Sequence, residues 1–150
     1  MDIRQFRVVL RSKNFDLTRH FYEEVLGLPC LEEWSREDGR GALFQAGEAV
    51  LEVHGRPAAD KGRGWDEGFD YQGPEQKLTL SLVVPSAEKA YEELLLRDKN
   101  IPGGLHRDAD GTLVFRTHDP DGVQVSFRQA AELGPERQRE LARAASAYGP

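Results

Sequence analysis

The sequence FYEEVL at Phe21–Leu26 recurs 69 positions later as AYEELL at Ala90–Leu95. Each copy follows a strand-like run of β-branched and aliphatic residues and precedes two or three further strand-like runs. This period exceeds the roughly 20–50 residues that are typical of solenoid and propeller repeats. The chain therefore contains the pattern of one half-domain twice. We expect a ligand site where the two halves meet.

The first half, at residues 3–55, predicts a strand, a helix and three more strands. Phe6–Leu10 alternates as a strand, and Asp16–Leu26 has the periodicity of a helix. We expect Leu17, Phe21 and Val25 to form the buried stripe of this helix, with Gly27 directly after its end. The three strands that follow are predicted at Cys30–Ser35, Gly41–Ala46 and Ala49–His54.

The second half, at residues 77–129, repeats this order. Lys77–Val84 alternates as a strand, and Ser86 is placed to cap a helix at Ala87–Arg97. Three more strands are predicted near Gly104–Arg107, Leu113–His118 and Val123–Arg128. The turns between them, Asp108–Gly111 and Asp119–Gly122, have the composition of tight hairpin turns. Each half is therefore β-α-β-β-β, and the predicted fold class is α+β.

Two segments lie outside the repeat. Residues 56–76 connect the halves and are rich in Gly, Asp and aromatic residues. Trp65, Phe69 and Tyr71 in this connector could form a lid over a ligand, an interface patch, or a cluster that holds the loop down. Residues 132–147 predict a polar C-terminal helix.

Length and composition restrict the class of protein. At 150 residues the chain is one domain with room for a core. Its net charge of −6 argues against nucleic acid as a partner. No apolar run approaches the roughly 18 residues of a membrane span, and the N-terminus has no signal-peptide core, so we expect a cytoplasmic protein. Cys30 is the only cysteine, and we expect it to be buried and inert.

Strand alternation separates an apolar face from a polar face. The apolar face is expected to pack on the helices, and the polar face either meets water or lines a cleft. Positive side chains in such a cleft would suit a small molecule that carries a negative charge or a carbonyl group. The predicted ligand-binding residues are Arg7, Arg11, Glu52, His54, Lys77, Thr79, Ser81, Gln124, Ser126 and Arg128.

The chain resembles the vicinal oxygen chelate superfamily, which includes glyoxalase I, bleomycin-resistance proteins, fosfomycin-resistance transferases and extradiol dioxygenases. The residues that carry the resemblance are Phe21–Leu28, Val50–Val53 and Asp119–Val125, and it covers about residues 3–129. It implies that the two modules form a curled, eight-stranded mixed sheet, and that the protein is a homodimer.

The family also implies a divalent metal held by one residue on each of four inward strand positions. Carried over to this chain, these positions are Arg7, Glu52, Thr79 and Ser126, of which only Glu52 suits a metal. Arginine has no acceptor for a metal, and serine and threonine hydroxyls are poor primary ligands. We therefore expect no metal and no cofactor, and an Arg7–Glu52 salt bridge in their place.

Three functions remain open at this point. The first is a metal-independent small-molecule-binding protein of the bleomycin-resistance type. The second is a lyase, isomerase or dioxygenase that uses an atypical metal site or acid–base chemistry at Glu52 and His54. The third is a structural or regulatory dimer with a vestigial cleft. The other histidines, His20, His106 and His118, are expected to be exposed.

Overall fold

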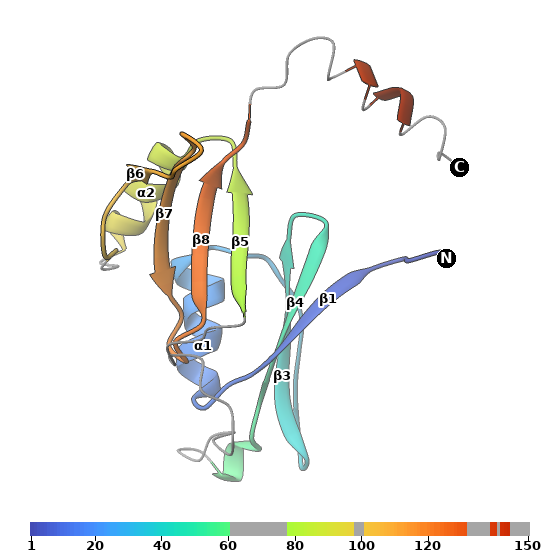
Figure 1. The fold of residues 1–150 in the computed structure, drawn as a ribbon. Helices are drawn as coiled ribbons and strands as arrows, with labels where there is room; N and C mark the ends of the chain where they lie inside the picture. Colours follow the sequence, from blue (N-terminus) through green and yellow to red (C-terminus); the bar gives the residue numbers. More distant parts are fainter. Residues whose placement is uncertain (61–77, 98–100, 132–138, 141, 145–150) are drawn as a thin grey trace.

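The computed structural model describes residues 1–60, 78–97, 101–131, 139–140 and 142–144. The chain forms the two predicted β-α-β-β-β modules, and the α+β fold class is confirmed (Figure 1). Module one consists of β1 (Phe6–Arg11), α1 (Phe15–His20), η1 (Phe21–Val25), β2 (Cys30–Arg36), β3 (Gly39–Ala46) and β4 (Ala49–Gly55), followed by the short η2 (Ala58–Asp60). Module two consists of β5 (Thr79–Val84), α2 (Ala87–Leu96), β6 (His106–Arg107), β7 (Leu113–His118) and β8 (Gln124–Gln129).

Each module has its own four-stranded mixed sheet. The strand orders are β1-β4-β3-β2 and β5-β8-β7-β6, so the two modules share one topology. The pairs β1–β4 and β5–β8 are parallel, and the remaining pairs are antiparallel. Within the described strands, the expected curling into one eight-stranded sheet is not seen, because β1 and β5 each pair on one side only.

The first helix begins and ends close to the predicted positions. Asn14 caps α1, since its side-chain oxygen accepts a hydrogen bond from the amide of Leu17 at 3.2 Å. The helix continues as the π-helical turn η1, and Gly27 follows with a positive φ of 72°. The predicted buried stripe is wrong at Leu17, which is 55% exposed. The buried side chains are instead those of Phe15, Thr18, Phe21 and Tyr22.

The second helix, α2, is capped at its N-terminal end by two side chains. Ser86 accepts a hydrogen bond from the amide of Lys89 at 3.2 Å, as the sequence predicts, and Gln129 accepts one from the amide of Ala87 at 2.8 Å. At its C-terminal end, the Arg97 guanidinium donates to the carbonyl oxygen of Val25 at 2.8 Å. The helix of module two therefore caps the free carbonyl end of the helix of module one.

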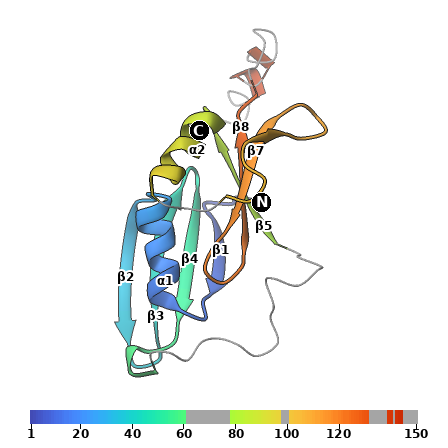
Figure 2. The ribbon, with the colours of Figure 1, turned by 90° about the vertical axis from the view of Figure 1, so that its left-hand side faces the viewer.

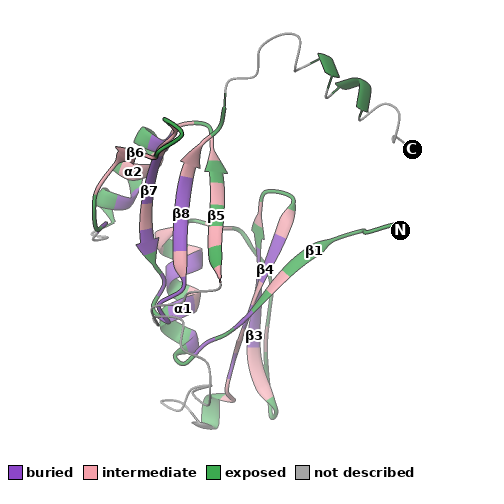
Figure 3. Ribbon diagram, viewed as in Figure 1, coloured by how far each residue is buried: buried purple, intermediate pink, exposed green. Residues whose placement is uncertain are grey.

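One hydrophobic core joins the modules. It contains residues of β1, η1, β3 and β4 together with residues of α2, β7 and β8. Figure 3 shows the buried residues along the inner strands of both sheets. In Figure 2, α1 lies across the strands of module one, while α2 lies beyond its end, near β7 and β8.

A buried polar network also connects the modules. The hydroxyl of Tyr22 donates to a carboxylate oxygen of Asp119 at 2.7 Å, and the hydroxyl of Thr18 donates to Asp121 at 2.9 Å. Asp121 also accepts a hydrogen bond from the amide of Lys13 at 2.7 Å. The β7–β8 turn, which the sequence predicts only as a local hairpin turn, therefore holds the first helix. We call Thr18, Tyr22, Asp119 and Asp121 the inter-module latch.

Some predictions fall outside the described residues. These are the site residue Lys77, the possible lid residues Trp65, Phe69 and Tyr71, and most of the connector. Most of the predicted C-terminal helix at residues 132–147 is also outside them. Its described part, residues 139–140 and 142–144, is helical and exposed.

Candidate functional site

The polar face of module one contains the predicted Arg7–Glu52 salt bridge. Arg7 lies on β1 and Glu52 on the neighbouring strand β4, and their side chains meet at 2.8 Å. The Arg7 guanidinium also donates to the side chain of Gln5, at 2.5 and 3.1 Å. About 40% of the Arg7 side chain is exposed, but only 14% of that of Glu52. The carboxylate is therefore held in place beneath the guanidinium.

Glu52 also contacts His54, two residues further along the same face of β4. The Nε2 atom of His54 hydrogen-bonds the carboxylate oxygen of Glu52 that Arg7 does not contact. The edge of the Trp34 ring lies against the imidazole, with 5.9 Å between ring centroids. Trp34 can lie there because residue 41 is glycine: a Cβ at Gly41 would come within 2.0 Å of the indole. The two partners of Glu52 therefore occupy both of its carboxylate oxygens.

The pKa of Glu52 is the result of opposing effects. Burial raises the pKa, but the hydrogen bonds from Arg7 and His54 outweigh burial and hold it below its ordinary value. Glu52 is therefore ionised at neutral pH. An ionised carboxylate with a lowered pKa is a weak base, so its natural role in this arrangement is to orient Arg7 and His54.

The four positions where the family places metal ligands do not fit a metal in this chain. The guanidinium at Arg7 is a fixed positive charge, already bonded to the single ligand-type residue, Glu52. Thr79 and Ser126 belong to the other sheet and offer only neutral hydroxyls. In the described part of the chain, no three His, Cys, Asp or Glu side chains come together as a possible ligand set.

The other predicted cleft residues lie on the polar face of module two or at the edge of module one. Thr79 and Ser81 on β5 are exposed, Gln124 is half-buried, and Ser126 is buried in the centre of the sheet. Arg11 on β1 is exposed. Of the ten predicted residues, the structure thus brings Arg7, Glu52 and His54 into one connected group. The ligand-binding role of the set stays a prediction.

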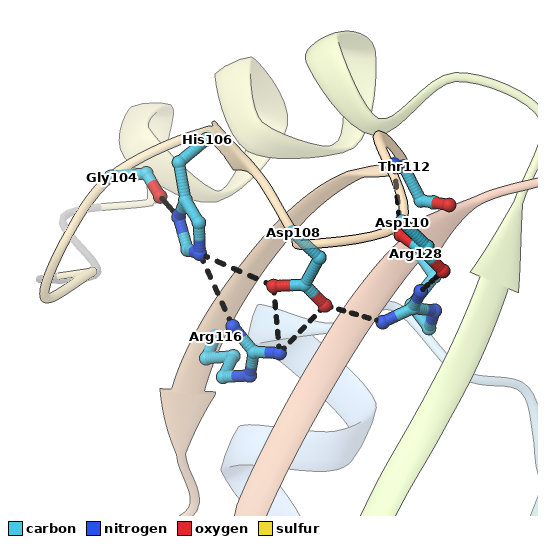
Figure 4. Close-up of polar contacts among 7 residues, drawn as sticks. All are labelled: Gly104, His106, Asp108, Asp110, Thr112, Arg116 and Arg128. Atoms are coloured by element: carbon cyan, nitrogen blue, oxygen red, sulfur yellow. Dashed lines mark hydrogen bonds and ion pairs between the residues drawn. The ribbon is translucent and has the colours of Figure 1, made fainter.

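Arg128, the last of the predicted cleft residues, belongs to an ion-pair cluster (Figure 4). Its guanidinium donates to Asp108 at 2.7 Å and to Asp110 at 3.0 Å. Arg116 on β7 donates to the same Asp108 carboxylate at 3.0 and 3.3 Å. The hydrogen bond from Arg128, then that from Arg116, lowers the pKa of Asp108. The guanidiniums of Arg116 and Arg128 are therefore already compensated by carboxylates.

His106 closes one side of this cluster. Its Nδ1 atom lies 2.9 Å from the carbonyl oxygen of Gly104, and its Nε2 atom lies 3.2 Å from the guanidinium of Arg116. A carbonyl only accepts and a guanidinium only donates, so the arrangement fits the neutral imidazole with its hydrogen on Nδ1. The prediction of an exposed His106 is wrong, because the ring is half-buried by these partners, whereas His20 and His118 are exposed as predicted.

The sequence held a signal for the cluster. Alternation along β7 places Arg116 on the same face as Arg128 of β8, and two guanidiniums at neighbouring positions need an acid. Asp108 and Asp110 also fit a hairpin turn, so the local pattern gives no sign of their second role as ion-pair partners. The inter-module latch was hidden in the same way, since Asp119 and Asp121 also belong to a turn.

Cys30 does not lie where it was predicted. It is exposed at the start of β2, where a register irregularity follows it, so the thiol is not turned into the core. Partial burial and the nearby carboxylates of Glu23 and Glu33 raise its pKa above the ordinary value. The thiol is therefore protonated at neutral pH, and the prediction of low reactivity fits this surrounding although the prediction of burial is wrong.

A cavity of about 320 Å³ lies between β1 and β4 of module one and β5 of module two. Most of its walls come from the apolar sides of these strands and from the end of the first helix, including Val8, Tyr22, Leu26 and Leu80. Thr79 and Ser81 are the members of the predicted cleft set that line it. The alternation of apolar and polar residues predicts which sides of the strands are apolar, but it does not predict that a cavity lies between them.

Comparisons with solved structures show the same fold at low sequence identity. SMU.1112c has a TM-score of 0.67 and 18% identity, over 85% of this chain and 98% of that one. Lactoylglutathione lyase from Agrobacterium tumefaciens has a TM-score of 0.60 and 14% identity, over 87% and 96%. A superfamily member from Sphaerobacter thermophilus DSM 20745 has a TM-score of 0.61 and 17% identity, over 87% and 99%. A search of curated proteins found no match.

No helix in the described residues is long and apolar enough to span a bilayer. The family model for the Glyoxalase/Bleomycin resistance protein/Dioxygenase superfamily matches residues 4–127, which is most of the chain. The two β-α-β-β-β modules are the architecture that the resemblance at Phe21–Leu28 and Asp119–Val125 implied. The chain therefore belongs to the Glyoxalase/Bleomycin resistance protein/Dioxygenase superfamily.

Proposed function

We propose that this protein is a metal-independent, small-molecule-binding member of the superfamily. The observation that carries the proposal is the Arg7–Glu52 ion pair at 2.8 Å, at the position where a metal would need ligands. A divalent ion bound there would have to displace the guanidinium and lie beside its positive charge. Glu52 is instead fully used by Arg7 and His54.

The test of this proposal has two parts. Protein purified without added metal is analysed for Ni, Zn, Mn and Fe, and its thermal unfolding is followed with a library of metabolites and antibiotics, with and without a chelator. We expect substoichiometric metal and at least one ligand that raises the melting temperature equally in both conditions. A specific ligand at a hundredfold excess over Kd adds about 2.7 kcal/mol of stability.

Two outcomes would contradict the proposal. Stoichiometric metal that is lost in Glu52→Gln would show that the family's metal site persists in altered form. A broad library without any thermal shift would favour a protein whose cleft is vestigial.

We also propose that the protein is a homodimer in the cytoplasm. Light scattering during size-exclusion chromatography tests the oligomeric state.

A second candidate function is acid–base catalysis at His54. The hydrogen bond from Glu52 fixes the orientation of the imidazole, as a carboxylate does for a catalytic histidine in other enzymes. Because the Nε2 atom faces Glu52, the proton-accepting atom would be Nδ1. Each ligand from the library is incubated with the protein, and conversion is followed by mass spectrometry. Conversion that is lost in His54→Gln but retained in His118→Gln would establish this function in place of simple binding.

A further inference from the structure

The cavity between the modules has mainly apolar walls. Phe6 and Val8 of β1 and Leu80 and Leu82 of β5 line it, Tyr22 and Val125 contribute from the core, and Thr79 and Ser81 add two hydroxyl groups. The described residues that line it include no carboxylate, amine, guanidinium or imidazole. The hydroxyl of Tyr22 is directed to Asp119 of the inter-module latch at 2.7 Å. Water in this space would therefore find few partners, which favours an apolar occupant.

The size of the cavity indicates the size of that occupant. A designed apolar cavity of about 150 Å³ in another protein is large enough for benzene. The cavity of about 320 Å³ in this chain is about twice as large and lies at the lower end of the range for ligand pockets. An occupant with two to three rings, or a comparable aliphatic body, would fill it.

The position of the cavity also supplies a few polar groups. β1 and β5 are edge strands, each paired on one side only. An edge strand presents backbone N–H and C=O groups that are not used within its sheet. A pocket with apolar walls and a few backbone donors and acceptors at its margin is typical of small-molecule sites. These groups suit a carbonyl or hydroxyl substituent on an apolar ligand.

The surrounding charges argue against an anionic occupant. Arg7 is paired with Glu52, and Arg128 with Asp108 and Asp110, on the polar faces. Among the described residues that line the cavity, a carboxylate or sulfonate would meet no cation to offset its loss of hydration. An uncharged molecule has no such cost.

We propose that the inter-module cavity binds an uncharged, predominantly apolar small molecule of two to three rings that carries at most a carbonyl or hydroxyl group. This inference rests on the proposed function and names its ligand class and its site. It differs from the anionic ligand in the polar cleft that the sequence predicts.

The probe pair for the test is N-phenyl-1-naphthylamine, which is uncharged, and its 8-sulfonate derivative, which has the same ring skeleton and a negative charge. Both become fluorescent in apolar surroundings, so both are titrated into the 150-residue protein. We expect the uncharged probe to bind at least tenfold more tightly than the sulfonate. Equal affinity, or preference for the sulfonate, would overturn the proposed ligand class.

The site is tested by filling the cavity. Ala49 lines it at the start of β4, and Ala49→Phe should weaken binding of the uncharged probe at least tenfold. The matched control is Ala130→Phe, at an exposed position outside the cavity, which should leave the affinity unchanged. Because Ala49→Phe could also disturb folding, Leu80→Trp fills the same space from β5. Circular dichroism and the melting temperature show which variants are folded.

The outcomes separate this inference from the proposed function. If binding survives both cavity-filling variants and is lost in Glu52→Gln, the protein is a binder but its site is the polar face. If the filling variants change the oligomeric state and leave probe affinity intact, the cavity belongs to a contact between copies of the chain. If the uncharged probe binds only after metal is added, the cavity site stands and metal independence fails. If neither probe nor any library compound binds, both proposals fail.

Discussion

Glu52 accepts hydrogen bonds at both carboxylate oxygens, from Arg7 and from His54, with only 14% of its side chain exposed. The family position suited to a metal ligand is thereby converted into the acceptor of an internal ion pair. In the sequence, Arg7 is the residue that argues most strongly against a metal site. Its guanidinium is positively charged and has no acceptor atom, so it cannot be a metal ligand at any geometry. The contact itself could be predicted because β1 and β4 are neighbours in this fold.

The lowered pKa of Glu52 predicts a pH-dependent stability. The unfolded chain takes up the proton near pH 4.5, the ordinary value, and the folded chain only at lower pH. The contribution of the ion pair is therefore complete above this range and is lost as the pH falls through the folded pKa. We expect Glu52→Gln to cost about 1 kcal/mol at pH 7 and less than that at pH 3. Urea denaturation of both proteins at the two pH values measures the difference.

Asp119 should show the opposite sign. Burial raises its pKa above the ordinary 3.8, despite the hydrogen bonds from Tyr22 and from the amides of Asp121 and Val123. The folded state therefore binds this proton more readily than the unfolded state, so the contribution of Asp119 falls as the pH rises through its folded pKa. Asp119→Asn removes this dependence. We expect the stability of wild type relative to Asp119→Asn to be higher at pH 4 than at pH 8; no change would contradict the raised pKa.

At the scale of elements, the first helix is held by a turn that lies about a hundred residues further along the chain. Tyr22 and Thr18 lie on successive turns of one face, which is why both can reach the β7–β8 turn. Arg97 at the end of α2 holds the C-terminal end of the same helix through the carbonyl of Val25. The helix is therefore held by module two at its middle and at its C-terminal end.

Removing the Tyr22 hydroxyl tests the latch. Tyr22→Phe leaves the ring packing intact but deprives the buried Asp119 of one donor, which should cost about 1–2 kcal/mol. The control is Tyr91→Phe on α2, where the ring packs on Phe115 with 5.5 Å between centroids and its hydroxyl bonds no described residue. This control should change stability by less than about 0.5 kcal/mol. Equal losses in the two variants would show that the latch contributes nothing specific.

The elements were predictable to the extent that they depend on local pattern. The caps Asn14 and Ser86, the glycine after the first helix and the alternating strands all express local backbone chemistry. Leu17 is exposed because the buried face of this helix runs through Phe15, Thr18 and Tyr22, and the apolar pattern of the sequence does not single out Thr18 as a buried residue. Contacts across the modules, such as Thr18 with Asp121, depend on how the halves pack, which no window of sequence encodes.

At the scale of the whole molecule, the backbone forms two separate hydrogen-bonded sheets, but the side chains of both modules share one hydrophobic core. Leu10, Phe44 and Leu51 of module one share this core with Phe115 and Phe127 of module two. Neither module could keep its apolar face away from water without the other. The repeat in the sequence therefore predicts two structural units, but it does not predict that the two units unfold independently.

This arrangement predicts one cooperative unfolding transition. In a Trp65→Phe background, Trp34 is the remaining tryptophan and reports on module one, while far-UV circular dichroism reports on both modules. We expect the two denaturation curves to have the same midpoint, as two-state folding requires. A fluorescence transition that precedes or follows the dichroism transition would show that module one unfolds on its own.

The two modules end differently at their outer edges. β2 has seven residues, whereas its counterpart β6 has only two, His106 and Arg107. Short and charged edge strands give an incoming chain little to pair with, which protects a sheet against aggregation. By contrast, β1 and β5 keep six-residue edges with exposed apolar side chains at Phe6 and Val83. If strands of different molecules add to one another, the growth of the assembly therefore proceeds from the long edges, β2 or the inter-module strands β1 and β5, and stops at β6.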